Sequence, residues 1–144
     1  MRAVSAASKP VPVADELSSG FWEASADGIL AMQRCGSCGW LAYPPGLVCI
    51  SCRADPPRFS WEPVSGQGRL KTWTVMRDSF LPGFDDDIPY VVADVELVEQ
   101  PGLRMVARLR GIGLDELVTS MPLVVAFGDP VDGMRVPHFV RGAS

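Results

Sequence analysis

The four cysteines of this chain lie within eighteen residues and constrain its fold more than any other feature. They form two C-x2-C pairs, Cys35 with Cys38 and Cys49 with Cys52, separated by ten residues. Two thiolates three positions apart can face one ion from a tight turn, and two such turns complete a tetrahedral shell of four sulfurs. The spacing therefore predicts a metal site that organises residues 35–52 around one ion.

Zinc in a structural role is the metal expected here, because four thiolates leave no coordination position open for chemistry. An iron site of the rubredoxin type has the same ligand geometry and stays open as an alternative. Two disulfides are disfavoured because no export signal is visible, and a redox-active pair usually opens a helix after a strand. The ten intervening residues instead indicate a short strand and a Pro-Pro-Gly turn, which is typical of a zinc ribbon.

Glycines flank only the first of the two cysteine pairs. Gly36 and Gly39 let the backbone curl so that amide N–H groups face the sulfurs. The second pair lies in Cys49-Ile50-Ser51-Cys52-Arg53, which contains no glycine. We therefore expect a less ideal turn there, with the same four ligands.

The chain divides into three segments. Residues 1–17 are expected to be a flexible N-terminal arm, because residues 1–14 are small, proline-containing and unpatterned. Residues 18–58 are expected to hold a short helix near 18–27, with Phe21 and Trp22 as its buried anchors, followed by the ribbon. Residues 59–144 contain strand-like runs near 69–77, 90–98, 103–110, 123–127 and 136–140. These runs predict a five-stranded OB-fold barrel, with an open sandwich as the alternative, and a mostly β fold overall.

Alternating side chains set which way two of these runs face. One apolar row comes from each run: Val91, Ala93, Val95 and Leu97, and then Leu103, Met105, Ala107 and Leu109. These rows are expected to face the barrel interior. A slip of one residue would bury three arginines, so the register is strongly specified. The run at 69–77 cannot be oriented from its sequence.

Charge and hydropathy disfavour two classes of protein. Thirteen basic and seventeen acidic residues give a net charge of −4, and from Gly66 onward eight basic residues face eleven acidic ones. Nucleic-acid binding depends on an excess of Lys and Arg, so a single-stranded nucleic-acid module is a disfavoured alternative. The longest apolar run, 121–127, has seven residues, whereas a membrane span needs about twenty. Without a membrane span or an apolar leader, we expect a cytoplasmic location.

Catalytic side chains are scarce. His138 is the one histidine and is expected to be half-exposed, no serine lies in a nucleophile elbow, and no phosphate-binding loop is present. The acidic triplet Asp85-Asp86-Asp87 is interpreted as a solvated turn. These observations leave the chain without an evident reaction of its own.

Two groups of residues are candidates for ligand or partner contact. Phe80 and Phe84 lie in the connection that leads to Tyr90, and OB barrels use this connection as one lip of their ligand face. Arg104, Arg108 and Arg110 form an outward row on the third barrel strand. The alternative for the arginines is cross-strand pairing with acidic neighbours, and exposed pairs of that kind contribute only about 0–1 kcal/mol each.

An ordered set of motifs runs through residues 18–141. It comprises Phe21-Trp22-Glu23, the stretch 33–39 around the first cysteine pair, Tyr43-Pro44-Pro45, Cys49-Ile50-Ser51-Cys52, Ser65-Gly66-Gln67-Gly68, the stretch 89–95 and Val125-Ala126-Phe127. With these motifs the chain resembles the rubredoxin-like zinc-ribbon plus OB-fold proteins associated with acyl-CoA metabolism, formerly a domain of unknown function. The second cysteine pair departs from the family by lacking the Pro and Gly often found there.

The resemblance implies an accessory role. Members of this family are similar to small non-catalytic subunits, encoded with or fused to thiolase-like enzymes or hot-dog-fold hydratases that act on acyl-CoA thioesters. Some serve acyltransferases, and others serve aldolases that shorten steroid side chains. We therefore expect a hetero-oligomer with a thiolase-like enzyme in fatty-acyl or steroid metabolism, in which this chain stabilises the partner and helps to hold the CoA thioester. A pure protein scaffold is the further alternative.

Overall fold

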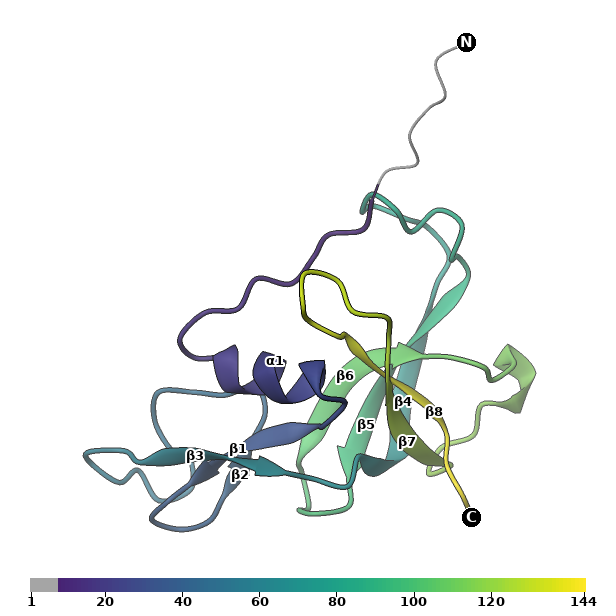
Figure 1. Ribbon diagram of the computed structural model, residues 1–144. Helices are drawn as coiled ribbons and strands as arrows, with labels where there is room; N and C mark the ends of the chain where they lie inside the picture. Colours follow the sequence, from purple (N-terminus) through teal and green to yellow (C-terminus); the bar gives the residue numbers. More distant parts are fainter. Residues whose placement is uncertain (1–7) are drawn as a thin grey trace.

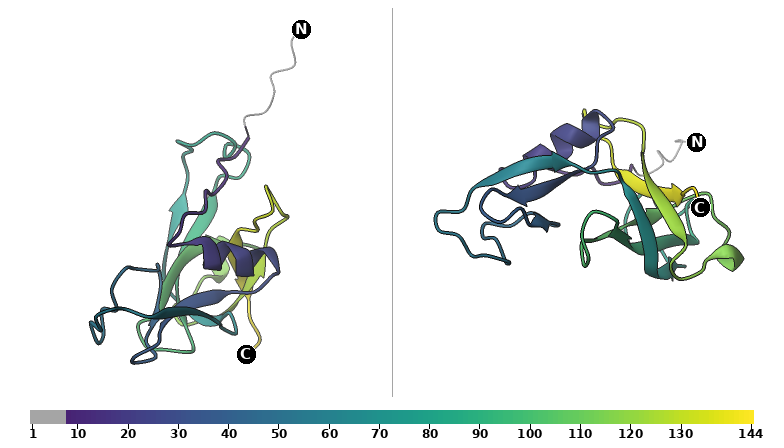
Figure 2. Two further views of the ribbon diagram at one scale, coloured as in Figure 1. Left: turned by 60° about the vertical axis from the view of Figure 1, so that its left-hand side comes forward. Right: turned by 90° about the horizontal axis from the view of Figure 1, so that it is seen from below.

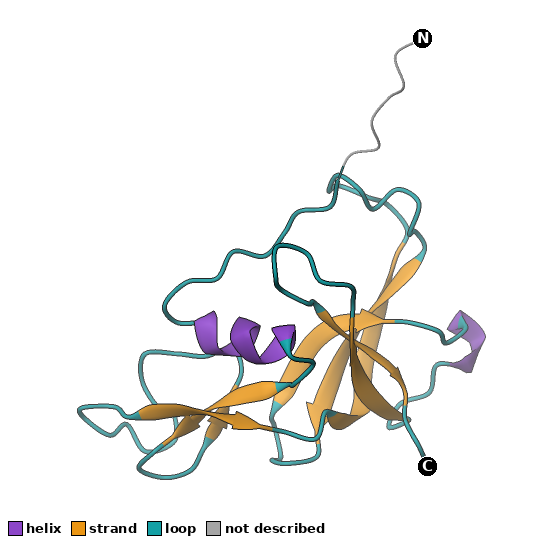
Figure 3. Ribbon diagram, viewed as in Figure 1, coloured by secondary structure: helices purple, strands orange, loops and turns teal. Residues whose placement is uncertain are grey.

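The computed structural model describes residues 8–144, which form two lobes built mostly of β-structure (Figures 1 and 3). The first, here the cysteine lobe, contains helix α1 (Ser19–Ala26) and strands β1 (Ala31–Cys35), β2 (Leu41–Ala42) and β3 (Phe59–Pro63). The second, here the barrel, contains strands β4 (Gln67–Met76), β5 (Tyr90–Leu97), β6 (Arg104–Leu109), β7 (Pro122–Phe127) and β8 (Pro137–Arg141), with a short 3-10 helix, η1 (Leu114–Glu116), after β6. Within the described range, no helix has the length and apolar character needed to cross a membrane. The mostly β fold class is confirmed.

The five barrel strands close on themselves in the order β4-β5-β6-β8-β7. Strand β7 returns to β4, where Leu123 faces Gly68, and β6 lies parallel to β8 at the pair Leu109 and Phe139. The other pairings in the barrel are antiparallel. A closed five-stranded barrel with this crossover matches the expected OB type and excludes the open sandwich.

The interior of the barrel is filled by the predicted apolar rows. Burial alternates strictly along β5, and β6 pairs with it so that Ala93 faces Ala107. The structure of strand β4 explains why the sequence of residues 69–77 did not show which of its side chains face the core. Leu70 is fully buried, but a bulge after it shifts the alternation, so that Trp73 and Val75 face the core instead of residues 72 and 74.

The cysteine lobe is a three-stranded sheet in the order β2-β1-β3, with α1 packed beside it (Figure 2). Strand β3 pairs antiparallel with β1 along Ala31–Cys35 and Phe59–Pro63. The boundary expected between residues 58 and 59 assigned β3 to the barrel, whereas its hydrogen bonds are made within the cysteine lobe. Only the linker at 64–66 separates β3 from β4.

Helix α1 begins one residue after Ser18 and ends before Gly28, which has a φ of +73°. Ser18, the N-cap residue, makes no side-chain hydrogen bond to the helix; the Asp15 carboxylate instead accepts hydrogen bonds from the backbone N–H and the hydroxyl of Ser18, both at 2.7 Å. Of the two expected anchors, Phe21 is buried and Trp22 is half-buried.

Hydrogen bonds and a shared core hold the two lobes together. The Gln100 side chain, in the β5–β6 turn, accepts from the backbone N–H of Leu41 at 2.9 Å and donates to its carbonyl at 2.8 Å. Phe21 and Met32 of the cysteine lobe belong to the same buried cluster as the barrel residues. The lobes therefore pack as one unit, and what lies between them can form a site.

The N-terminal segment that leads to α1 runs along the barrel (Figures 1 and 2). Residues 1–7 of the expected flexible arm lie outside the described residues. In the described part, the Lys9 ammonium lies 2.6 Å from the Asp87 carboxylate and 5.3 Å from the centre of the Phe84 ring. This segment is thus tied to the β4–β5 loop, which the sequence pattern did not indicate.

Candidate metal centre and interlobe cleft

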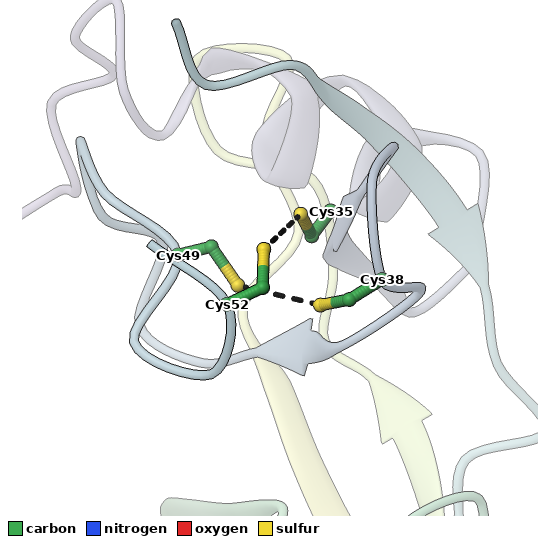
Figure 4. A group of neighbouring side chains, drawn as sticks. All are labelled: Cys35, Cys38, Cys49 and Cys52. Carbon is green, nitrogen blue, oxygen red and sulfur yellow. Dashed lines mark hydrogen bonds between the residues drawn. The ribbon is translucent and has the colours of Figure 1, made fainter. Parts of the chain in front are cut away.

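The four cysteine sulfurs point toward one centre (Figure 4). The Sγ atoms of Cys35 and Cys52 are 3.7 Å apart, those of Cys38 and Cys49 are 3.6 Å apart, and all four lie within 4.8 Å of one another. A tetrahedral ion with metal–sulfur bonds of about 2.3 Å has sulfur–sulfur edges of about 3.8 Å, whereas a disulfide needs about 2.0 Å. The donor set and its spacing therefore fit a metal ion, and these four cysteines could bind one.

The two cysteine turns have the same backbone geometry. The N–H of Gly39 donates to the Cys35 carbonyl at 2.8 Å, and the N–H of Arg53 donates to the Cys49 carbonyl at 3.0 Å. Both of these donor residues have a positive φ, +76° for Gly39 and +54° for Arg53. The second turn thus keeps the shape of the first, with an arginine in a conformation that favours glycine.

Backbone N–H groups around the sulfurs favour thiolates. Hydrogen bonds from the backbone of Cys38, then of Ser37, lower the pKa of Cys35 to about 6. The backbone of Cys52 likewise lowers the pKa of Cys49. A hydrogen bond from the backbone of Ala54 lowers the pKa of Cys52, but burial and the neighbouring thiols outweigh it and raise that pKa to about 12. Cys52 therefore keeps its proton when no cation is bound, and ionisation of all four thiols at this spacing would need a cation at their centre.

The loop that carries the second cysteine pair is held by a buried side chain. Gln33, on β1, donates from its amide to the Gly46 carbonyl and accepts from the Gly46 N–H, both at 2.9 Å. Gln33 is 5% exposed and Gly46 lies three residues before Cys49. In the sequence analysis, Gln33 appeared only within a motif; the signal that could have identified it is its place on the same strand face as Ala31 and Cys35, two residues before a cysteine.

A second candidate site is a cleft between the two lobes, with a volume of about 650 Å³. The cysteine lobe contributes Phe21, Trp22 and Tyr43, and the barrel contributes β6 and the segment between β7 and β8. Residues 9–12 of the N-terminal segment complete the wall. The cleft exists only because the lobes pack against each other, so no local pattern in the sequence predicted it.

Some of the predicted contact residues come together around Phe84 and Arg108, which line this cleft. Phe84 stacks beside Tyr90 with ring centres 5.8 Å apart, and the Arg108 guanidinium lies 4.7 Å from the centre of the Tyr90 ring. Arg108 also donates to Asp87 at 2.7 Å. The Lys9 ammonium has the larger effect on the pKa of Asp87 and the Arg108 guanidinium the next, and together they lower that pKa to about 2. Asp87 is thus an ion-pair partner rather than part of a free solvated turn.

The other predicted contacts lie apart from this cluster. Arg104 pairs with Asp94 across the strands, in the manner of the alternative considered for the arginine row, and Phe80 is 87% exposed at the tip of the β4–β5 loop. Arg110 lines the cleft and has no ion pair within residues 8–144. The row expected from the sequence therefore divides into three environments.

His138 lies in the wall of the cleft, half-buried on β8. Burial is the main cause that lowers its pKa, and the charges of Arg110 and Arg108 add to the effect. The sequence predicted a half-exposed strand histidine. The structure places this histidine beside two arginines because β8 pairs with β6 and β7.

Comparisons with known proteins match this architecture. The family model described as "ChsH2, C-terminal OB-fold domain" matches residues 61–136. A solved structure titled "Ltp2-ChsH2(DUF35) aldolase" contains a chain that superposes with a TM-score of 0.79 at 30% sequence identity. The match covers 91% of the present chain and 98% of that chain.

Curated relatives come from bacteria and archaea. A "Probable enoyl-CoA hydratase alpha subunit" of Thermomonospora curvata is 33% identical over 91% of this chain, which spans only 39% of that subunit. A "DUF35 domain-containing scaffold protein" of Methanothermobacter thermautotrophicus is 30% identical over 72% of this chain and 68% of the relative. A protein of the same description from Methanocaldococcus jannaschii is 28% identical over 65% and 64%.

Proposed function

The chain belongs to the family of the ChsH2 C-terminal OB-fold domain and the DUF35 scaffold proteins, and on this premise we propose that it is a non-catalytic accessory subunit of a thiolase-like acyltransferase or aldolase. In this role the chain binds the enzyme and stabilises it, and the enzyme supplies the catalytic groups. The reaction would belong to fatty-acyl or steroid side-chain metabolism in the cytoplasm.

The single observation that carries this proposal is the match to a chain of the aldolase structure. It covers nearly all of both chains, so the cysteine lobe and the barrel are both included and keep a common arrangement. The scaffold-protein descriptions of the two archaeal relatives support the same role.

A hydratase is the second candidate partner, favoured by the Thermomonospora relative. This chain corresponds to 39% of that subunit, so most of the subunit has no counterpart here. If a separate enzyme chain supplies the part of that subunit that has no counterpart here, the two chains together would contain the same parts as the Thermomonospora subunit.

Zinc is the metal we propose for Cys35, Cys38, Cys49 and Cys52. Tetrahedral S4 geometry and thiolates stabilised by backbone N–H groups support it, and iron would use the same ligands. The ion would stiffen the two turns and thereby the end of the cysteine lobe, with no open position for catalysis. Elemental analysis of the purified protein distinguishes zinc from iron, and a metal-free folded protein would contradict the proposal.

We also propose that this chain helps the enzyme to hold the CoA thioester. The candidate contacts are Phe84, Arg108 and Arg110 in the lining of the cleft, Tyr90 packed against Phe84 and Arg108, and Phe80 and Arg104 at exposed positions. Arginine forks match phosphate geometry, and aromatic faces can stack on an adenine ring.

Co-expression with the thiolase-like enzyme or the hydratase encoded nearest to this chain tests the assembly. We expect one complex on size-exclusion chromatography and a higher melting temperature for the enzyme in the complex than alone. If the enzyme and this chain elute separately, with unchanged melting temperature and thioester turnover for the enzyme, the accessory role is refuted. A single-stranded DNA titration at several salt concentrations checks the nucleic-acid alternative, for which a steep salt dependence is required.

A further inference from the structure

A short segment near the N-terminal end of the described chain, residues 9–14 and here called the strap, lies along the interlobe cleft. It runs from the β4–β5 loop to α1 (Figure 1). Residues 9–12 belong to the lining of the cleft. Val11 and Pro12 are half-buried, whereas Val13 is 88% exposed. The strap therefore covers part of the cleft through its N-terminal half.

The strap is held by contacts of its first residue. The Lys9 ammonium lies 2.6 Å from the Asp87 carboxylate and 5.3 Å from the centre of the Phe84 ring. Residues 10–14 make no hydrogen bond with any part of the chain that the structure describes. The Lys9 side chain is 44% exposed, so water reaches the ion pair. Its contacts can therefore open without unfolding of either lobe.

The sequence Pro10-Val11-Pro12 makes the strap stiff. Proline has a fixed φ and no N–H to donate, and the residue before a proline is restricted to extended conformations. A stiff segment moves as one piece about its attached end. That end is fixed where the Asp15 carboxylate accepts two hydrogen bonds from Ser18, just before α1. Loss of the contacts at Lys9 would thus displace the whole strap.

We propose that the strap gates the interlobe cleft, and that the contacts of Lys9 keep it closed. In the closed state Lys9 contacts Asp87, and in the open state residues 9–12 no longer line the cleft. An exposed ion pair and one cation–π contact stabilise the closed state only modestly, so both states are populated. The gate concerns access to the cleft and goes beyond the accessory role, because it requires neither a partner subunit nor a particular ligand.

His138 provides a chemical reporter of access, because it is the one histidine of the chain and lines the same cleft. Diethyl pyrocarbonate, a small uncharged reagent, acylates neutral imidazole. Burial, then the charges of Arg110 and Arg108, lower the pKa of His138, and Lys9 is not among the causes. At pH 7.5 the imidazole is therefore neutral whether Lys9 is present or not. A change in labelling rate then reports access rather than intrinsic reactivity.

The experiment measures the rate at which diethyl pyrocarbonate labels His138 in the full chain, by absorbance and by peptide mass spectrometry. Lys9→Met should be labelled about threefold to tenfold faster than the parent, because the rate follows the open fraction. Lys9→Arg keeps the charge and should retain the slow rate. Lys71→Met is the matched control at the other lysine of the chain, which pairs with Glu96 at 3.7 Å outside the cleft lining, and should not change the rate.

Salt and a second reporter test the same opening. About 1 M sodium chloride screens the exposed ion pair and should speed labelling of the parent but not of Lys9→Met. Trp22 lines the same cleft, and comparison with Trp22→Phe isolates its fluorescence from that of the other tryptophans. Acrylamide, which is also uncharged, should quench Trp22 more strongly in Lys9→Met than in the parent.

Equal labelling rates in the parent and Lys9→Met, or the same acceleration in Lys71→Met, overturn the inference. A labelling rate that rises steeply with low concentrations of urea also overturns it, because His138 would then be reached by unfolding of the barrel. Co-elution of Lys9→Met with the enzyme partner tests assembly alone, so the gate and the accessory role can fail separately.

Discussion

Replacing Asp87 by Asn should lower the stability of this protein in a pH-dependent manner. The Asp87 carboxylate joins two parts of the chain, with Lys9 of the N-terminal segment at 2.6 Å and Arg108 of β6 at 2.7 Å. Asparagine keeps the size and one hydrogen-bond acceptor but removes the charge. The substitution therefore tests the ionic contribution with little change in packing.

The magnitude follows from the pKa of Asp87. Its two cationic partners lower that pKa from 3.8 to about 2, which corresponds to at most about 2–3 kcal/mol of unfolding free energy. The side chain remains 22% exposed, and solvent screening reduces the contribution to about 1–2 kcal/mol. A depressed pKa stabilises the folded state above the unfolded value and loses this effect as pH falls through the folded value. The stability difference between the two proteins should be constant above pH 5, shrink as the pH falls toward 2 and vanish below pH 2.

Urea unfolding followed by tryptophan fluorescence measures this difference at pH 7, 5, 4 and 3. Both proteins carry the same cysteine cluster, so loss of a metal ion at low pH cancels in the comparison. Asp86→Asn, at an exposed carboxylate one residue earlier, is the control and should differ from the parent by less than about 0.5 kcal/mol. Lys9→Ala should destabilise the parent but not Asp87→Asn, because the pair no longer exists there.

Two results would refute the reasoning. One is a stability difference that stays the same from pH 7 to pH 3, since the lost interaction would then not be ionic. The other is an equal effect of the changes at Asp86 and Asp87, since that would reflect the general charge of the loop and not the pairing seen in the structure.

Three further changes test the cysteine lobe. Cys49→Ser should reduce the bound metal to well below one ion per chain in elemental analysis and lower the melting temperature; retention of a full equivalent would exclude it as a ligand. Gln33→Ala removes both hydrogen bonds to Gly46 and should cost about 1–3 kcal/mol in denaturant unfolding, with a faster loss of metal to a chelator. Gly20→Ala places a Cβ in overlap with the Trp61 indole, and this overpacking should cost about 1–3 kcal/mol, more than the gain in helix propensity of about 1 kcal/mol. A higher melting temperature would contradict the observed packing of α1.

Local patterns were sufficient for several parts of this fold. The cysteine spacing indicated which four side chains gather, because two tight turns bring thiolates together whatever surrounds them. The alternation of apolar residues along β5 and β6 indicated which side chains fill the barrel, since successive residues of a strand face opposite sides. The order of five short strands separated by turns was enough to predict the closed barrel.

Other features depend on contacts that no local pattern contains. The bulge after Leu70 shifts the alternation of β4, and β3 joins the sheet of the cysteine lobe although it directly precedes the barrel. The three arginines of one predicted row meet different partners, because the β4–β5 loop and the N-terminal segment bring Asp87 and Lys9 to Arg108 alone.

The sequence by itself thus determined which four cysteines gather at one point, the strands and the facing of the barrel core. The tertiary structure alone decided where the lobes meet, and with it the cleft, the isolation of Arg110 and the placement of His138 beside it. The physical reason is the range of the interactions. Turns and strand faces arise from neighbours in the chain, whereas the lobes are joined by pairs such as Leu41 and Gln100, which are 59 residues apart.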